Sequence, residues 1–241
     1  MKHMLIFLLV SIILVIGGCS SESSKATEDM EVVKENVTTK AKGDEQEKTK
    51  PPHKYQVQLG ENTFTIDLKK HSILNNFVST SKDPQAKLET MKFIPVTMNE
   101  HADKALIEFA CYENRCSYIL IDFSKETSIL LADLAKLEQV QVSHDNQMAI
   151  KFGRTNQDGV TTHHVEVVDL SNLEEKTLTI DDENFPEATY QAYQFPIENM
   201  GWTSTSELTI DIPRVEDYAS YNLENWKAKG APATTITLTI N

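Results

Sequence analysis

Glycine and cysteine are scarce in this chain, and their scarcity excludes several classes of function. Of 241 residues, 8 are glycine and 3 are cysteine. Phosphate-binding loops need closely spaced glycines, because only a residue without Cβ lets the backbone approach a phosphate. The chain contains neither a P-loop nor a Rossmann glycine pattern, and it lacks the Gly-x-Ser-x-Gly and His-Glu-x-x-His motifs. The sequence therefore gives no support for nucleotide enzymes or for these hydrolase families.

Positive charge is also scarce. The 23 Lys and Arg residues are outnumbered by 36 Asp and Glu residues, for a formal net charge of −13. After Lys54 the counts are 15 and 28, so the whole negative excess lies in residues 55–241. Such a segment repels polyanions, which argues against nucleic acid as a partner.

Only one long apolar run occurs, at residues 4–16, directly after Lys2 and His3. Its length of about 13 residues falls short of the ~20 that a membrane-spanning helix needs, and is typical of a signal-peptide core. No other segment is apolar enough to span a membrane. The run ends in Ile16-Gly17-Gly18-Cys19, a small-residue pair directly before a cysteine.

This ending resembles the lipobox of bacterial lipoproteins. The resemblance implies cleavage after Gly18 and a diacylglycerol thioether on Cys19, with Ile16 standing where the family more often has Leu. Acyl chains of this kind (palmitate and its relatives) hold a protein on a membrane when about two are present. The alternative is an ordinary secretory signal with a chance cysteine. We expect a lipid anchor on the cell membrane, facing the extracytoplasmic side.

Residues 20–54 alternate Ser, Thr, Glu and Lys, contain no aromatic residue and carry Pro51-Pro52 near their end. Such a composition cannot offset the entropy of ordering. We therefore expect three parts: a signal peptide at 1–18, a lipidated cysteine with a disordered tether at 19–54, and one folded domain at 55–241.

The folded part has the apolar and polar alternation of β-strands. After a hairpin around Gly60-Glu61-Asn62, one order of strands and tight turns occupies residues 94–123, is repeated over 140–170, and begins a third time at 200–212. The predicted strands are 94–98, 105–111, 116–123, 140–143, 148–152, 162–170, 200–203 and 207–212. A last strand at 235–240 is expected to pair with an early element. Short helices are expected at 84–92 and inside 214–232, and 127–138 is open between helix and strand.

A period of about 40–50 residues is typical of propeller blades. The segments 142–150 and 165–170 resemble the turn-and-strand sequence motifs of TolB-like and WD-type propeller blades. The domain is too short for the usual six to eight blades, so the resemblance implies either a very small ring or an open stack. We predict an all-β fold, propeller-like or built from stacked antiparallel meander sheets, with one or two short helices.

Two cysteines remain after Cys19. If Glu113-Asn114 is a two-residue hairpin turn, Cys111 lies opposite Cys116 at a distance that a disulfide tolerates. An even pair in an oxidising compartment favours a bridge. A redox-active pair is the alternative, but the pair lacks the Cys-x-x-Cys spacing.

Two segments carry metal-ligand residue types. In His163-His164-Val165-Glu166, the side chains of His164 and Glu166 share a strand face while His163 points the other way. In Asp181-Asp182-Glu183-Asn184 the oxygens suit calcium, but the EF-hand spacing is missing. Neither segment offers a complete ligand set, so we expect solvated surface residues and no metal or other cofactor.

Aromatic and acidic residues gather in two long connections, 181–199 and 214–232. Aromatic platforms among carboxylates suit stacking on sugars, peptides or cations. We therefore expect a binding protein for a protein, peptide or glycan partner; the alternative is a surface hydrolase or metal-dependent enzyme whose site is assembled from residues distant in sequence. The predicted binding residues are Tyr190, Tyr193, Tyr218, Tyr221 and Trp226.

The lipid anchor is directly testable. Changing Cys19→Ala should leave the protein unprocessed or release it from the membrane, because the thioether to diacylglycerol can no longer form. Membrane fractionation and mass spectrometry of the mature N-terminus measure both effects. A variant that is still cleaved and membrane-held like the wild type contradicts the lipobox interpretation.

Overall fold

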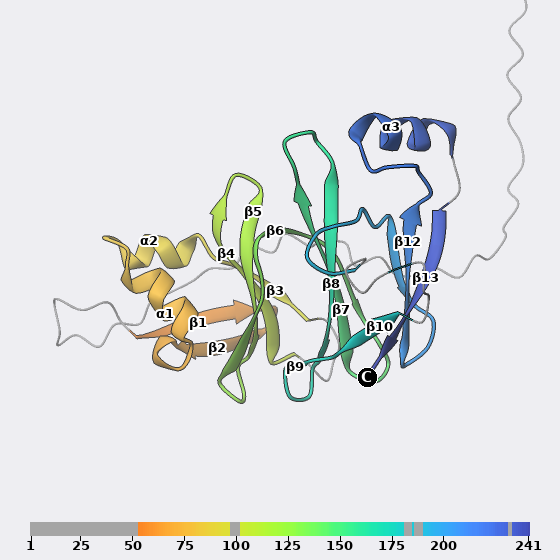
Figure 1. The fold of residues 1–241 in the computed structure, drawn as a ribbon. Coiled ribbons are helices and arrows are strands. Elements are labelled where there is room, and N and C mark those ends of the chain that lie inside the picture. The colour runs from red at the N-terminus through yellow and green to blue at the C-terminus, as the bar shows by residue number, and fades with distance from the viewer. Residues whose placement is uncertain (1–52, 97–101, 181–184, 186–189, 231–232) are drawn as a thin grey trace, which may run out of the picture. The chain divides into compact units, whose positions relative to one another are not determined.

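The computed structural model describes residues 53–96, 102–180, 185, 190–230 and 233–241 (Figure 1). All of these residues belong to a single compact unit of the chain, Val32–Asn241. The signal segment, Cys19 and the tether up to Pro52 lie outside the described residues. Within the described part, no helix has both the length and the apolar character needed to cross a bilayer.

The described strands form three antiparallel sheets. The first is the hairpin of β1 (Lys54–Leu59) and β2 (Asn62–Asp67). The second, in the order of its strands, is a seven-stranded meander of β3 (Lys92–Pro95), β4 (Lys104–Tyr112), β5 (Arg115–Asp122), β6 (Thr127–Val142), β7 (Gln147–Thr155), β8 (Thr161–Asp169) and β9 (Glu174–Glu175). The third has the order β10 (Leu178–Ile180), β13 (Ala233–Ile240), β12 (Glu207–Pro213) and β11 (Asn199–Trp202).

The described helices are short and lie in the connections (Figure 1). They are the 3-10 turn Leu68–Lys70, α1 (Ser72–Ser79), α2 (Pro84–Glu89) and α3 (Ser220–Lys229). In α2, Pro84 occupies the first turn and the Asp83 side chain accepts a hydrogen bond from the Ala86 N–H. The helix α3 ends at Gly230, whose φ of 57° is the left-handed conformation that glycine adopts without strain.

Three hydrophobic layers hold these elements together, because strands of the large meander bury both faces. One face of β4 and β5 packs with the β1–β2 hairpin, α1 and α2. Their other face packs with β6 and with one face of β7. The opposite face of β7 and β8 packs against the third sheet. Residues on neighbouring positions of one strand thus serve different layers, as Leu106 and Ile107 do.

The strand β6 settles the alternative left open at 127–138. Leu130, Leu134 and Leu137 recur at helical spacing, yet the segment is a strand that pairs with β5 over its first half and with β7 over its second. Leu130 and Leu134 are 46% and 45% exposed, so the helical spacing of leucines does not correspond to a buried face. The buried residues of this segment are Leu131, Ala132 and Ala135, and the strand interpretation is correct because the backbone pairs with a neighbouring strand on each half.

The predicted all-β class is confirmed: antiparallel meanders dominate and the described helices are few and short. No sheet of the described residues closes on itself, so the propeller resemblance stays a prediction. Some details differ from expectation, among them the short strands β9 and β10, which were not predicted. The helix α1 was not predicted, and β13 pairs with β10 and β12 rather than with an early element. The segment carrying α3 is therefore the loop of the β12–β13 hairpin, with Pro213 opposite Ala233 at its base.

Candidate functional site

A cavity of about 330 Å³ lies where the two aromatic-acidic connections meet the large meander. Its lining includes Thr161 and His163 of β8, the segment 196–198 of the first connection, and α3 of the second. From α3 the side chains of Leu223, Glu224 and Lys227 contribute. We call this cavity the α3 pocket.

The pocket is built on three polar side chains from adjacent strands, here called the polar cluster: Glu138 of β6, Lys151 of β7 and His163 of β8. The Glu138 Oε2 atom lies 2.8 Å from His163 Nε2 and 3.9 Å from Lys151 Nζ. The side chains of Lys151 and His163 are only 7% and 8% exposed, and that of Glu138 is 21% exposed. Polar groups buried to this extent are costly unless each has partners.

Both ring nitrogens of His163 have partners. The Ile197 N–H donates to Nδ1 at 2.7 Å, so Nδ1 holds no proton and Nε2 is the donor to Glu138. The His163 backbone N–H also donates to the Phe195 carbonyl at 2.9 Å. The imidazole is thereby a fixed linker between Glu138 and the segment 195–197.

The Lys151 ammonium attaches the same segment. It donates to the carbonyls of Ile197 at 3.0 Å and Glu198 at 3.2 Å. Burial lowers the pKa of Lys151, and the nearby charges of Glu138 and Glu198 oppose that shift. The hydrogen bond from His163 holds the pKa of Glu138 below its ordinary value, against the opposing effect of burial.

Gly153 of β7 leaves the room that Glu138 occupies. It pairs with Lys136 on one side and with His163 on the other. A Cβ at this position would lie 2.8 Å from Glu138 Oε1 and 3.0 Å from Thr161 Cγ2. A residue with a side chain here would therefore displace the carboxylate from the cluster.

The lining of the α3 pocket has more negative than positive charge. It contains four carboxylates, of Glu138, Asp158, Glu198 and Glu224, and two ammonium groups, of Lys151 and Lys227. The Lys227 Nζ atom lies 3.7 Å from Glu198 Oε1. This ion pair is largely exposed, so it contributes little to the stability of the fold. Within the described residues, no hydrogen bond or ion pair engages the carboxylates of Asp158 and Glu224. These two exposed acids are the groups free to bind a ligand.

The predicted aromatic residues of the first connection point inward. Tyr190 is 2% exposed, and its hydroxyl donates to the Leu178 carbonyl at 2.5 Å. The Tyr193 ring stacks under the Arg154 guanidinium, 3.9 Å from ring centroid to Cζ, and lies 5.6 Å from the His164 ring. Tyr190 is thus a core residue, and Tyr193 is held in a half-buried stack.

The predicted aromatic residues of the second connection differ from one another in exposure. Tyr218 is half-buried in an edge-to-face contact with Phe195, with ring centroids 5.4 Å apart. Trp226 is half-buried on α3, whereas Tyr221 on the same helix is 72% exposed. The five predicted residues therefore do not form one exposed surface, and Tyr221 is the most exposed aromatic side chain among them.

Glu166 is buried and His164 is half-buried, whereas both were expected to be solvated. Glu166 is 5% exposed, and neither its Oε2 atom nor His164 Nδ1 has a hydrogen-bond partner among the described residues. Both line a second cavity of about 270 Å³, together with Glu175. Burial, and then the charge of Glu175, raises the pKa of Glu166 to about 8, so this carboxyl is neutral at pH 7. The other acidic candidate, 181–184, lies outside the described residues.

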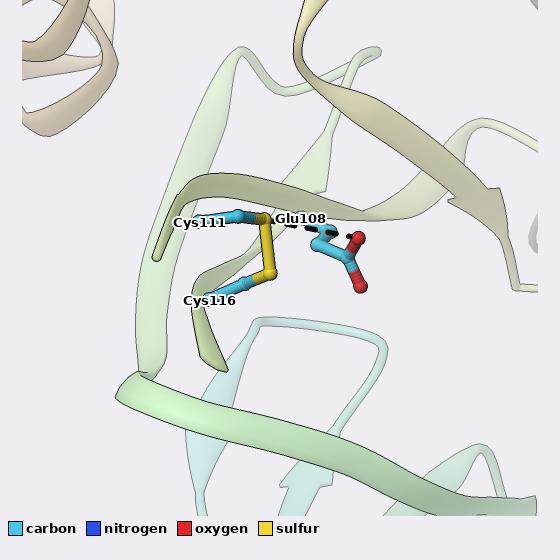
Figure 2. Close-up of side chains that lie close together, drawn as sticks. All are labelled: Glu108, Cys111 and Cys116. Carbon is cyan, nitrogen blue, oxygen red and sulfur yellow. Dashed lines mark hydrogen bonds between the residues drawn. A yellow bond between two sulfur atoms is a disulfide. The ribbon is translucent and has the colours of Figure 1, made fainter. Parts of the chain in front are cut away.

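The two cysteines of the β4–β5 hairpin are joined, as predicted (Figure 2). Their Cα atoms are 4.0 Å apart and their sulfurs are within bonding distance. Tyr112 pairs with Arg115 as expected, a register that places Cys111 opposite Cys116, and the register then shifts between Phe109 and Tyr112. Ala110, inside this irregularity, has a φ of 51°.

The polar cluster was not predicted, because its members are single polar residues on three different strands. One signal was present: Lys151 interrupts the apolar strand Met148-Ala149-Ile150-Lys151-Phe152. A lysine at such a position has to find buried acceptors or disrupt the strand.

Loss of the cluster's carboxylate charge should destabilise the fold. In Glu138→Gln the buried Lys151 ammonium loses its nearby counter-charge. The free energy of unfolding should therefore fall by up to about 3 kcal/mol. This value is at the lower end of the range for a broken buried ion pair, because the Glu138 side chain is partly exposed. Urea unfolding measures this, with Glu113→Gln on the exposed hairpin turn as control. A loss no larger than that of the control contradicts the role given to Glu138.

The buried Glu166 predicts an unusual pH dependence. The folded chain keeps its proton up to about pH 8, whereas the ordinary pKa is 4.5. Between these values the folded state binds more protons, so stability should fall as pH rises, by at most about 1.4 kcal/mol per pH unit. Glu166→Gln should remove this slope and be the more stable protein at pH 8. Equal slopes for wild type and variant in urea unfolding between pH 5.5 and 8 would show that Glu166 is charged in the folded state.

Three comparisons with known proteins gave no match. No protein-family model matches the chain, and no curated protein and no solved structure is significantly similar to it. The function has to be inferred from the pocket, its charges and the signals in the sequence.

Proposed function

We propose that the protein is a lipid-anchored, extracytoplasmic binding protein that captures a cationic group of a protein or peptide partner in the α3 pocket. Cys19 provides the anchor in this proposal, and the tether up to residue 54 has a mean reach of roughly 30–35 Å. The domain could then sample partners beyond the lipid headgroups.

The excess of carboxylates in the α3 pocket is the observation that carries the proposal. Asp158 on the β7–β8 turn and Glu224 on α3 both line the pocket, and among the described residues neither carboxylate has an ion-pair partner. A lysine or arginine side chain entering between them gains two opposite charges and loses little hydration, because both acids remain exposed. The net charge of the domain attracts such a partner over a longer range.

Both aromatic-acidic connections contribute to this one pocket, the first through 196–198 and the second through α3. That meeting point supports the expectation that the connections form the binding surface. Tyr221 on α3 adds an exposed aromatic side chain, of the kind that anchors partners at interfaces. The buried Tyr190 packs in the core with the third sheet and makes no contact with the partner in this proposal.

An enzyme is the second candidate, because a carboxylate next to a histidine also occurs in hydrolases. The hydrogen bonds of His163 argue against it. Its Nε2 donates to Glu138 and its Nδ1 accepts from Ile197, which leaves no nitrogen free to take a proton from a nucleophile. The cluster therefore suits a structural scaffold under a binding pocket better than a general base.

The test is binding of fluorescein-labelled pentalysine to the full chain at low salt, measured by fluorescence anisotropy. Asp158→Asn with Glu224→Gln should weaken binding about tenfold, the effect of two partly exposed ion pairs of ~0.7 kcal/mol each. Tyr221→Ala should weaken it further without loss of stability, since the ring is mostly exposed.

The matched control is Glu61→Gln with Glu207→Gln, which removes the same charge from two exposed acids outside the pocket. This control should change binding less than twofold. Equal weakening by both double variants would mean that only the net charge attracts the peptide. Preference for an uncharged oligosaccharide over pentalysine would contradict the cationic partner.

A further inference from the structure

The tip of the β4–β5 hairpin gathers three groups that ligate metals. The two sulfurs of Cys111 and Cys116 and a carboxylate oxygen of Glu108 all lie within 4.8 Å of one another. Figure 2 shows the Glu108 side chain extending toward the Cys111 sulfur, 3.9 Å from Oε1. Among the described residues this is the one group of three such atoms so close together.

The Glu108 carboxylate is held in this orientation. The Tyr118 hydroxyl donates to its Oε2 atom at 3.0 Å, and the Lys92 ammonium lies 2.5 Å from its Oε1 atom. The side chain of Glu108 is 14% exposed, whereas that of Lys92 is 72% exposed. The tyrosine therefore fixes the carboxylate from the protein side, and the lysine can move away into solvent.

While the disulfide is intact, neither sulfur is a thiolate, and thiolate is the form that binds metal. We propose that reduction of the Cys111–Cys116 bond converts the hairpin tip into a zinc site with ligands from Cys111, Cys116 and Glu108. A dithiol reductant donates two electrons and two protons, the S–S bond breaks to give two thiols, and the dithiol becomes a disulfide. Binding of Zn²⁺ then releases the two thiol protons, and a water completes the four ligands.

The hairpin should keep its shape when the bond is broken. The bridge closes a loop of about six residues, and closing so small a loop adds only ~2 kcal/mol to stability. On one side β4 pairs with β3, and on the other β5 pairs with β6, so neighbouring strands hold both arms. The three ligand atoms therefore stay within a few ångströms, and small side-chain rotations reach Zn–S distances of ~2.3 Å and Zn–O distances of ~2.1 Å.

Access and charge favour the same site. Cys111 is exposed beside Tyr112, which is 64% exposed, whereas Cys116 is buried. A thiolate from solvent thus attacks the Cys111 sulfur, and Cys116 is the leaving group. Two thiolates and one carboxylate carry three negative charges, which Zn²⁺ and the neighbouring Lys92 together neutralise.

The test uses the full chain with Cys19→Ala, so that no other cysteine is present. Oxidised and phosphine-reduced samples are incubated with Zn²⁺ and desalted, and bound zinc is measured by elemental analysis. The reductant is a phosphine rather than a dithiol, because dithiols themselves bind zinc. The reduced protein should retain about one zinc per chain, and the oxidised protein close to none. Zinc should also raise the melting temperature of the reduced protein alone.

Two variants separate this site from adventitious binding. Cys111→Ser with Cys116→Ser should retain no zinc under reducing conditions, and Glu108→Gln should lower zinc affinity at least tenfold while circular dichroism shows the fold intact. The proposal is overturned if reduced wild type retains no more zinc than the double serine variant, or if Glu108→Gln binds as tightly as wild type. Unfolding of the wild type on reduction also overturns it, because the site needs the folded hairpin.

Discussion

Burial of the Lys151 ammonium is the constraint on which the α3 pocket depends. Removing an ammonium from water costs several kcal/mol unless its donors are satisfied. Two of its acceptors are the backbone carbonyls of Ile197 and Glu198, and the Glu138 carboxylate supplies the counter-charge. The lysine can therefore be buried only when the segment 196–198 is docked on the meander. Docking of this segment and hydrogen bonding of the ammonium therefore occur together. His163, on the neighbouring strand, holds the same segment by accepting a hydrogen bond from the Ile197 N–H.

The architecture explains where such a site can be placed. Strands of the large meander bury both faces, so their side chains serve packing and few are free for chemistry. Variation is tolerated in the connections at the ends of strands. The two long connections meet over β8, and the polar cluster fixes one of them while the β12–β13 hairpin carries the other. The pocket thus combines a rigid, internally satisfied floor with exposed acids at its rim.

Much of the fold could be predicted from alternation alone, because strands with a buried face repeat every two residues, as in Met148, Ile150 and Phe152. Where two signals compete, the sequence is ambiguous: the leucines of β6 recur at helical spacing, and a φ of 48° at Leu134 marks a break in the alternation of that strand. The helix α1 was missed because Asn75 and Asn76 are weak helix formers in its middle, and its stability comes from packing of Leu74 and Val78.

The site was less predictable than the fold for a physical reason. Aromatic residues in a long connection suggest a surface, but Tyr190 is a core residue whose hydroxyl has a backbone acceptor. The acceptors of Lys151 are likewise backbone carbonyls of residues 46 and 47 positions later in the chain. Backbone groups carry no side-chain signature, so the pairing becomes visible only in three dimensions.

The protonation of His163 tests the central claim most directly. Long-range proton–nitrogen NMR spectra of the imidazole distinguish its tautomers. The proton should lie on Nε2, and Nδ1 should show the shift of a hydrogen-bond acceptor. A doubly protonated ring, or a proton on Nδ1, would mean that the Ile197 N–H does not donate to it and that the segment 196–198 is not docked as described.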